Sequence, residues 1–552
     1  MPLARWIVLG ILAAGALVGL ALLAISLVPG ATLAGRLLGA AGEARAGVNT
    51  QELLLYFDQR LRLAGALLLA MVAGLTLLRG SFEELISAAI HDASWPTTWP
   101  ERWTLVLVGV PVVLALGLRL VFLGQPMRYD EALTFNEFAS RPLYYGLSFY
   151  PDPNNHLLNT LLMHAAYLAF GNQPWVLRLP ALIGGVGLVA ATFWLAHLLY
   201  GRGAAVLAAT LVAVASYAIE YSTNARGYTL QALCFVLLLA LCVVAVRRAS
   251  LSALLLAAIV GALGAYDLPT MLYGVAIAAV WLLVSFSAAR AGRVGTRHLV
   301  ASGVLMGFLV VLLYLPVLLV SGADKLVGNR FVVPLSWTQL GPELMSTLGR
   351  TWAFWNRDVP WLLSAVLLVG FAIATVIEAR QRRVPLGVLA VGVCLVLIVA
   401  QRVAPFERVW LFLLPLYLVI ASGGLTRFVD GRILAVGFGL VLAYFSVTSG
   451  SILSSTETGT FPDAEGVSRT LAPRLAPDDA VVTRLPASLP ELQYYFPRYG
   501  LPVSVLVRSP DEAQNLWVVA PTGDQPDVTG WSTAAEVERY SSATLWELKR
   551  SR

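Results

Sequence analysis

Long runs of apolar residues recur along the chain and constrain its fold more than any other feature. A helix needs about 20 apolar residues to cross the roughly 30 Å hydrocarbon core of a bilayer, and about thirteen segments reach or approach that length. Charged residues make up only 13% of the 552 residues, against about 25% in soluble domains. We therefore predict a polytopic α-helical membrane protein. The predicted spans lie near residues 6–28, 61–79, 102–123, 178–199, 203–219, 228–246, 251–266, 270–288, 298–320, 360–378, 385–401, 409–423 and 433–449.

Arginine is distributed unevenly between the loops of this predicted bundle. Lys and Arg are enriched in cytoplasmic loops of membrane proteins. If the N-terminus with Arg5 is cytoplasmic, every second loop faces the cytoplasm, and these loops hold the arginine clusters. The odd number of spans then places residues 124–177 and the C-terminus outside the cytoplasm, in a multi-pass protein of the inner or plasma membrane. The loop arginines are Arg202, Arg247, Arg248, Arg290, Arg293, Arg297, Arg380, Arg382, Arg383, Arg427 and Arg432.

Composition divides the chain into three regions. Residues 1–100 are predicted to form an accessory transmembrane hairpin and a linker; the first apolar run exceeds the 7–15 residues of a signal peptide, so we expect it to be retained as a span. Residues 101–450 form the main membrane domain, with long outer loops at 124–177 and 321–360. Residues 451–552 have a soluble composition that predicts a small extracytoplasmic α/β domain. Its predicted strands are 479–483, 515–519 and 544–548, with a helix at 487–495.

The apolar segment from His156 to Phe170 is too short to cross the membrane, because it would span only about 22 Å as a helix. Its apolar side chains share one face, whereas His156, Thr160, His164 and Tyr167 line the opposite face. This amphipathic pattern is typical of a helix that lies in the membrane interface. Counting it as a span would also reverse every later loop and break the arginine asymmetry.

Several classes of function are not supported by the sequence. The three cysteines, Cys234, Cys242 and Cys394, lie inside apolar runs and predict no disulfide framework. No two of the five histidines are spaced i,i+4 and no His-Glu-x-x-His is present, so we expect no metal site and no cofactor, although a divalent cation requirement stays open. A P-loop and a glycine-rich dinucleotide turn are absent. The net charge of +6 comes largely from loop arginines, and without an aromatic-interleaved basic stripe it does not predict a nucleic-acid partner.

Two adjacent carboxylates, Asp130 and Glu131, follow the third predicted span directly. Carboxylates beside a bilayer are costly unless they are solvated or used. A carboxylate outside the membrane can act as a general base, which makes this pair the best catalytic candidate. The alternative is structural: both acids could cap a helix that begins at Ala132, because acids favour helix N-termini.

The motifs around these acids occur in a specific order. The segment Arg-Tyr-Asp-Glu-Ala-Leu-Thr (128–134) precedes Pro-Asn-Asn-His-Leu-Leu-Asn (153–159), and the short amphipathic helix then ends at Phe170-Gly171. Arg-Leu-Pro-Ala-Leu-Ile-Gly (178–184) and Glu-Tyr-Ser-Thr-Asn-Ala-Arg-Gly-Tyr (220–228) follow. This order resembles the GT-C superfamily of membrane glycosyltransferases, in the family 39-like branch of protein O-mannosyltransferases and lipid A aminoarabinose transferases. The resemblance covers roughly 101–425 and is strongest from 127 to 246.

The resemblance implies an activity. Members of the superfamily transfer a sugar, with inversion, from a polyprenyl-phosphate donor to an acceptor on the outer face of the membrane. By this resemblance Asp130 is the expected base, with Glu131 beside it. The acceptor, a glycan, a lipid or a protein hydroxyl, is left open, and membrane lipid is an expected partner.

The resemblance also implies residues that bind the donor phosphate or the acceptor. In the second motif Ser222, Ala225, Arg226 and Tyr228 match the family pattern, but Asn224 replaces its acid. Glu220 lies four residues earlier, and whether it replaces the missing acid is open. Arg226 could bind a phosphate through the paired N–H donors of its guanidinium. Alternatively, its long side chain could simply extend its charged end to the membrane–water interface. 

His156 aligns with the histidine of the family's His-Pro-Pro segment, although Leu157 and Leu158 replace both prolines. It could contact the phosphate or the acceptor, or could be an ordinary interfacial histidine. Arg408 lies in a segment that resembles the family's late Arg-Tyr-Leu-Leu-Pro motif and opens a span on the outer side, where a lipid phosphate would lie.

Two other functions compete with the enzyme. A secondary transporter places ionisable groups or broken helices near the middle of the membrane, whereas here the acids and arginines gather at one face. A catalytically inactive, lipid-binding scaffold is also possible, because the family's acid is missing at Asn224.

Overall fold

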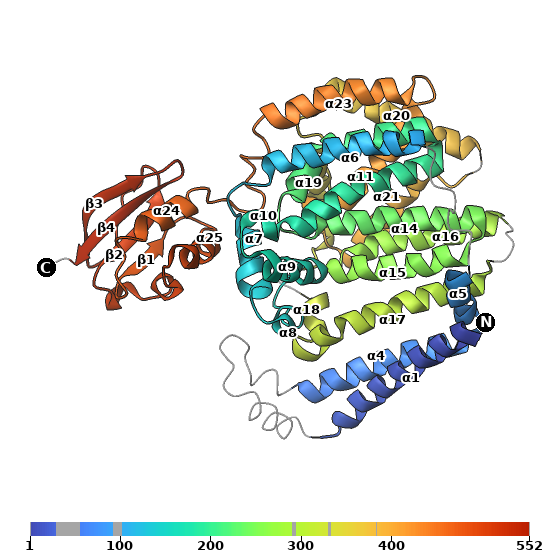
Figure 1. The fold of residues 1–552 in the computed structure, drawn as a ribbon, viewed down its shortest axis with the longest axis horizontal. Coiled ribbons are helices and arrows are strands. Elements are labelled where there is room, and N and C mark those ends of the chain that lie inside the picture. The colour runs from blue at the N-terminus through green and yellow to red at the C-terminus, as the bar shows by residue number, and fades with distance from the viewer. Residues whose placement is uncertain are drawn as a thin grey trace.

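The chain folds into a bundle of long helices with a separate α/β unit at one end (Figure 1). The computed structural model describes residues 2–28, 56–91, 102–289, 294–328, 333–381 and 383–550. The N-terminus lies at the end of the bundle far from the α/β unit, and the C-terminus lies on that unit (Figure 1). The predicted linker at the end of the first region covers residues 80–100; residues 80–91 are helical, within α5 (Arg79–His91), and residues 92–100 fall outside the described ranges.

Nine helical segments within the described ranges are long and apolar enough to cross a membrane. A further pair of helices, α12 and α13, passes the same test together but is bent by 62°, and three shorter apolar helices lie beside them in the bundle. The nine are α1 (Pro2–Ile25), α4 (Phe57–Leu77), α6 (Arg102–Phe122), α11 (Leu179–Tyr200), α14 (Tyr228–Arg248), α17 (Thr296–Val320), α20 (Trp361–Arg380), η2 (Glu407–Leu413) with α22 (Leu414–Leu425), and α23 (Gly431–Thr448). The others are α12 (Arg202–Val214), α13 (Ser216–Ser222), α15 (Leu251–Asp267), α16 (Met271–Ala289) and α21 (Leu386–Gln401).

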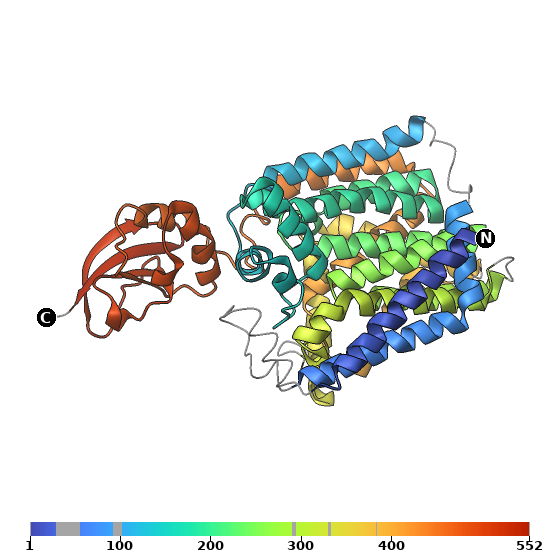
Figure 2. The same ribbon diagram turned by 60° about the horizontal axis from the view of Figure 1, so that its bottom comes forward.

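Each predicted span coincides with one of these helices, so the polytopic helical fold is confirmed. The number of thirteen stays a prediction, because α15 and α21, with 17 and 16 residues, are shorter than the roughly 20 residues of a straight span, and α12 is bent against α13. Most of the long helices run along a common direction in two views, whereas α1 is tilted against them (Figures 1 and 2).

The break between α12 and α13 is supported by a buried arginine. A helix that stops leaves carbonyl groups without an intrahelical partner. Arg119, fully buried in the last turn of α6, donates from Nη1 to the carbonyl oxygen of Ala213 at 3.0 Å. The segment after the bent α13, residues 223–227, lies at the end of the bundle that carries the α/β unit.

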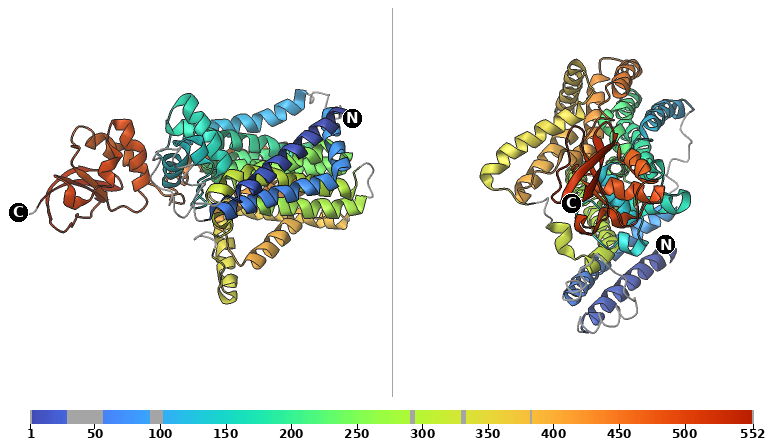
Figure 3. Two further views of the ribbon diagram at one scale, coloured as in Figure 1. Left: turned by 90° about the horizontal axis from the view of Figure 1, so that it is seen from below. Right: turned by 90° about the vertical axis from the view of Figure 1, so that its left-hand side faces the viewer.

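Short helices cover that end of the bundle. After α6 come α7 (Tyr129–Thr134), the π-helix η1 (Phe135–Ala139), α8 (Leu143–Gly146), α9 (Leu157–Phe170) and α10 (Pro174–Leu177). The predicted juxtamembrane helix is α9, whose Leu168 and Phe170 are exposed while Leu157 and Met163 are buried. Residues 321–360, predicted as a long outer loop, are mainly helical. They hold α18 (Ala323–Val327) and α19 (Trp337–Trp355), which runs crosswise to the long helices (Figure 3). At the opposite end, α5 (Arg79–His91) follows α4.

The C-terminal unit contains a four-stranded sheet in the order β1-β2-β4-β3. β1 pairs with β2 in parallel, whereas β4 is antiparallel to both of its neighbours. The three predicted strands are present, but β3 was not predicted. The elements are α24 (Ala464–Leu471), β1 (Ala480–Thr483), α25 (Leu489–Tyr495), η3 (Phe496–Tyr499), η4 (Val503–Leu506), η5 (Pro510–Glu512), β2 (Leu516–Pro521), β3 (Trp531–Arg539) and β4 (Ala543–Arg550).

This unit is packed onto the short helices rather than tethered by a free linker. One hydrophobic core joins Phe135 and Met163 of the membrane domain to Phe461 and Tyr494 of the C-terminal unit. The hydroxyl of Tyr495 also accepts a hydrogen bond of 3.1 Å from the backbone N–H of Met127. The unit therefore lies at the Asp130 end of the bundle, and its location outside the cytoplasm stays a prediction.

Candidate active site

A cavity of about 450 Å³ lies at this end of the bundle, where α7, α9, α14, α16 and η2 meet. Five of the seven predicted site residues line it: Asp130, His156, Arg226, Tyr228 and Arg408. They come from four segments far apart in the sequence. The other lining residues are Tyr129, Leu133, Asp152, Pro153, Asn154, Leu268, Thr270, Tyr273, Gln401, Val403, Pro405, Phe406 and Val409.

Asp130 lies in the first turn of α7, which begins at Tyr129, three residues earlier than predicted. Its backbone N–H donates to the carbonyl oxygen of Thr458 at 3.2 Å. Its half-buried carboxylate makes no hydrogen bond or ion pair with any side chain in the described part of the chain, although it lies close enough to Arg408 to attract that guanidinium. The carboxylate is therefore available to a ligand in the cavity.

Glu131 points away from the cavity and is fully buried. Its two oxygens accept from Arg178 at 2.8 and 2.7 Å, and also from the backbone N–H groups of Ala225 at 2.6 Å and Arg128 at 3.0 Å. Burial alone would raise the pKa of Glu131, but the Arg178 guanidinium and these hydrogen bonds hold it below its usual value. The geometry thus gives Glu131 a structural role, including the capping contact to Arg128, and does not support the predicted catalytic role.

Arg226 and His156 form a buried pair on one wall of the cavity. Arg226 donates from Nη1 to Thr134 Oγ1 at 2.6 Å and to the carbonyl oxygen of Asn154 at 2.7 Å. Its Nη2 lies 2.9 Å from His156 Nε2, and its buried Nε has no hydrogen-bond partner among the residues that the structure describes. On the other side of the ring, the backbone N–H of Gly227 points at Nδ1 at 2.9 Å.

These contacts place two N–H donors around one imidazole. Burial, followed by the charges of Arg226 and Arg408, lowers the pKa of His156 well below its usual value, so the ring is neutral. A neutral imidazole has one donor and one acceptor nitrogen. Because only one ring nitrogen can accept, one of the two contacts of His156 brings two N–H groups face to face. This wall of the cavity therefore has more hydrogen-bond donors than acceptors.

Arg408 and Tyr228 complete the lining. Arg408 is half-buried at the start of η2, stacks over Phe406 with 5.0 Å between Cζ and the ring centre, and donates to the carbonyl oxygen of Glu457 at 3.4 Å. Tyr228 packs edge-to-face on His156, with ring centres 4.9 Å apart. Its ring therefore fixes the imidazole beside Arg226.

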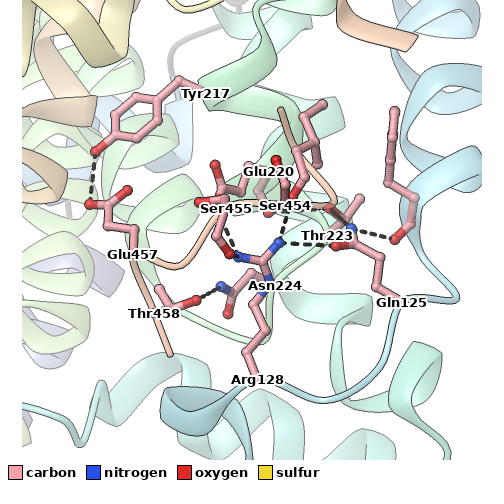
Figure 4. Close-up of polar contacts among 12 residues, drawn as sticks. Gln125, Arg128, Tyr217, Glu220, Thr223, Asn224, Ser454, Ser455, Glu457 and Thr458 are labelled. Atoms are coloured by element: carbon pink, nitrogen blue, oxygen red, sulfur yellow. Dashed lines mark hydrogen bonds and ion pairs between the residues drawn. The ribbon is translucent and has the colours of Figure 1, made fainter. Parts of the chain in front are cut away.

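Glu220 was predicted as a binding residue, but it does not line the cavity. It is buried and paired with Arg128 at 3.1 Å and with Arg357. Asn224, at the position of the family's acid, donates to Thr458 Oγ1 at 3.1 Å (Figure 4). The family's acid is missing at Asn224, and Glu220 does not bring a carboxylate to the cavity in its place.

One buried acid near the site was not predicted from the sequence. Asp267, at the end of α15, is fully buried. Its Oδ1 accepts from the backbone N–H of Asn159 at 3.0 Å, and its Oδ2 has no hydrogen-bond partner in the described part of the chain. A Cβ at Gly227 would approach this carboxylate to 2.5 Å, so Asp267 supports the turn that carries Arg226. The sequence does contain a signal that could have identified Asp267. It is the only acid between Glu220 and Asp324, and ionisable residues in apolar runs mark functional regions.

No cluster of three or more His, Cys, Asp or Glu residues suited to a metal ion is found in the described ranges. The expectation of no metal and no cofactor stays a prediction.

Comparisons with known proteins bear on this site. Residues 157–317 match the family described as dolichyl-phosphate-mannose-protein mannosyltransferase. No curated protein sequence matches the chain. Among solved structures, apo ArnT from Cupriavidus metallidurans is similar with a TM-score of 0.52 at 14% identity, over 81% of this chain and 97% of that one. An Archaeoglobus fulgidus oligosaccharyltransferase in complex with zinc and sulfate aligns with a TM-score of 0.46 at 15% identity, over 75% of this chain and 68% of that one.

At such low identity the similarity to ArnT shows the fold alone, and the family match adds the sequence of α9 through most of α17. Both agree with the resemblance to the GT-C superfamily of membrane glycosyltransferases that the motifs indicate.

Proposed function

We propose that the protein transfers a sugar from a polyprenyl-phosphate donor to an acceptor hydroxyl at the outer face of the membrane, with inversion at the anomeric carbon. The observation that carries this proposal is the cavity that holds Asp130, Arg226 and Arg408 together at one end of the bundle. The name of the matched family supports a lipid-phosphate sugar as donor.

The two arginines are suited to the donor phosphate. Arg226 has an unpartnered Nε and an Nη2 that meets another possible donor, so an anionic oxygen would satisfy groups that the protein leaves unsatisfied. Guanidinium groups bind phosphate through paired, charge-assisted hydrogen bonds. Arg408 lies across the same cavity and would add a second cation as the phosphate leaves.

Asp130 is suited to the acceptor. In the proposed step the acceptor oxygen forms a bond to the anomeric carbon while the bond from that carbon to the phosphate oxygen breaks. The hydroxyl proton moves to the Asp130 carboxylate, and the polyprenyl phosphate leaves with the electron pair. Because its carboxylate has no side-chain hydrogen bond in the described ranges, Asp130 can accept this proton without breaking a protein contact.

The test is turnover by the purified protein, supplied with polyprenyl-phosphate sugars and an envelope acceptor extract. We expect Asp130→Asn to lose about 10²- to 10⁴-fold in turnover, the usual contribution of a general base, with donor binding retained. Asp524→Asn is the matched control, since that side chain is exposed in a loop of the C-terminal unit. Near-normal turnover in Asp130→Asn would refute the assignment of the base.

An inactive lipid-binding scaffold is the second candidate, favoured by one observation. Asn224, which stands in for the family's acid, is engaged with Thr458 and brings no charge to the cavity. A scaffold would bind polyprenyl phosphate with normal dependence on Arg408 but show no turnover with any donor, so the same assay separates the two candidates.

A further inference from the structure

Arg128, two residues before Asp130, connects three parts of the molecule. It is 4% exposed, and its guanidinium makes four hydrogen bonds. Nη1 donates to Glu220 Oε1 at 3.1 Å and to the carbonyl oxygen of Ser455 at 3.0 Å. Nη2 donates to Gln125 Oε1 at 3.0 Å and to the carbonyl oxygen of Ile452 at 2.7 Å. Figure 4 shows this guanidinium between the loop after α6, the end of α13 and the segment after α23.

We call residues 452–460, in the segment after α23, the strap. It leads from the last helix of the bundle into the C-terminal unit and runs beside the start of α7. The backbone N–H of Tyr129 donates to the carbonyl oxygen of Gly459 at 3.3 Å, next to the bond from Asp130 to Thr458. Gly459 has φ +73°, and a Cβ there would approach the Tyr129 Cβ to 2.5 Å. The backbone of the strap therefore fixes the first residues of α7.

The strap also contacts the wall that carries Arg408 and the second motif. The carbonyl oxygen of Glu457 accepts from Arg408, and Thr458 Oγ1 accepts from Asn224. Tyr217 Oη donates to Glu457 Oε1 at 3.4 Å. A displacement of the strap would therefore change the position of Asp130 relative to the opposite side of the cavity.

We propose that Arg128 is a positioning residue that clamps the strap against α13 and the loop after α6, and so holds Asp130 at its working distance from the bound donor. This inference rests on the proposed glycosyl transfer. Arg128 does not line the cavity, so it acts through the backbone of residues 128–130 and 452–460. The C-terminal unit then contributes to catalysis through the strap that leads into it.

The structure indicates which kinetic quantity should change. Arg226 is held by Thr134, Asn154 and His156, none of which belongs to the strap. Arg408 has one long bond of 3.4 Å to the strap, at the carbonyl oxygen of Glu457, and keeps its stacking contact with Phe406 when the strap moves. Donor binding should therefore survive the loss of the clamp, whereas the placement of Asp130 should not. Glu220 keeps Arg357 as a partner when Arg128 is replaced. The carboxylate near the end of α13 therefore remains paired with an arginine.

The experiment uses the full-length protein in detergent with Arg128→Gln. We expect kcat to fall about 10- to 100-fold, as small misplacements of reacting groups do, while the Kd for polyprenyl phosphate changes less than about twofold. Arg508→Gln is the matched control, because Arg508 also donates to two backbone carbonyls, those of Pro477 and Asp479, within the C-terminal unit. It should leave kcat unchanged. Unchanged kcat in Arg128→Gln would overturn the proposal.

A covalent clamp provides the rescue. Asn224→Cys with Thr458→Cys joins two positions whose side chains meet at 3.1 Å, and the three native cysteines lie elsewhere, on the helices α14 and α21. Oxidation of this pair in the Arg128→Gln background should restore kcat to that of the oxidised pair alone, and reduction should remove the gain. A loss of kcat that oxidation does not restore, or a pair that fails to crosslink with Arg128 present, would overturn the clamp.

The rate of crosslinking also tests the clamp without any turnover. Arg128→Gln should slow disulfide formation between the two introduced cysteines, since the strap would spend less time against Asn224's position. If the unsubstituted protein shows no glycosyl transfer, the proposed function fails, and this rate still decides whether Arg128 holds the strap. Equal crosslinking rates with and without Arg128 would refute the clamp whatever the activity.

Discussion

Glu131→Gln should destabilise the fold far more than the change at the adjacent Asp130. Glu131 and Arg178 are both fully shielded from solvent, and the carboxylate accepts two bonds from Arg178 and two from backbone N–H groups. A glutamine amide keeps one acceptor oxygen and turns its NH₂ toward a donor. Breaking a buried ion pair by neutralising one partner costs about 3–5 kcal/mol. That is a large part of the roughly 5–15 kcal/mol by which a typical domain is stable.

The assay is thermal unfolding of the detergent-purified protein, with Asp130→Asn as the neighbouring control. Asp130 has no side-chain partner in the described ranges, so its neutralisation should cost only the roughly 0.3–1 kcal/mol of a charge at a helix N-terminus. Replacing Glu131 and Arg178 together by methionine should be less damaging than Glu131→Gln alone, because no charge is then left buried. If Glu131→Gln unfolds like the unsubstituted protein yet loses turnover as Asp130→Asn does, Glu131 acts in the chemistry and our reasoning is wrong.

Three further predictions follow from the site and its surroundings. Arg408→Ala and Arg226→Ala should each weaken polyprenyl-phosphate binding about 10- to 150-fold in a lipid-binding titration, since a hydrogen bond to a charged group contributes about 1.5–3 kcal/mol; unchanged affinity in both would exclude them from the phosphate site. Burial, with the nearby charges of Asp130 and Glu131, raises the pKa of Glu491 to about 8, so its stabilising effect is complete below its usual pKa and is lost as the pH rises toward and through 8. The C-terminal unit should therefore unfold at a lower temperature at pH 9 than at pH 6, and Glu491→Gln should remove that difference. A reporter fused to the C-terminus should be active only if it is exported, and cytoplasmic activity would reverse the predicted orientation.

The membrane fold could be predicted because apolar length and loop arginine are properties of single segments. Each apolar run became a helix, and α9 was recognised as too short to cross. The gathering of Asp130, His156, Arg226 and Arg408 was predictable for another reason: all four lie outside the predicted spans, in segments that the arginine pattern places on the same side. A bundle of antiparallel spans brings such positions to one end.

The roles of the individual acids were not predictable in this way. Glu131 and Glu220 lie at the same end of the bundle as Asp130. Glu131 is paired with Arg178 and Glu220 with Arg128, and in each pair at least one helix lies between the two residues in the sequence. Sequence position tells which end of a helix a carboxylate occupies and not which partner faces it. The strap was missed for a related reason, since it acts mainly through backbone carbonyls, and these carry no residue signature.

The distribution of ion pairs separates the charges that build the site from those that remain for a ligand. A buried ion is costly unless it is paired, and the buried acids Glu131 and Glu220 are both matched with arginines. Asp130, Arg226 and Arg408 line the cavity, and none of them has a salt bridge within the described ranges. Arg226 and Arg408 thus face the cavity without a salt bridge in the described ranges, while Asp130 attracts Arg408 from a longer distance. An anionic phosphate bound to the two arginines would offset part of their charge and leave the Asp130 carboxylate free to take the proton of a neutral hydroxyl.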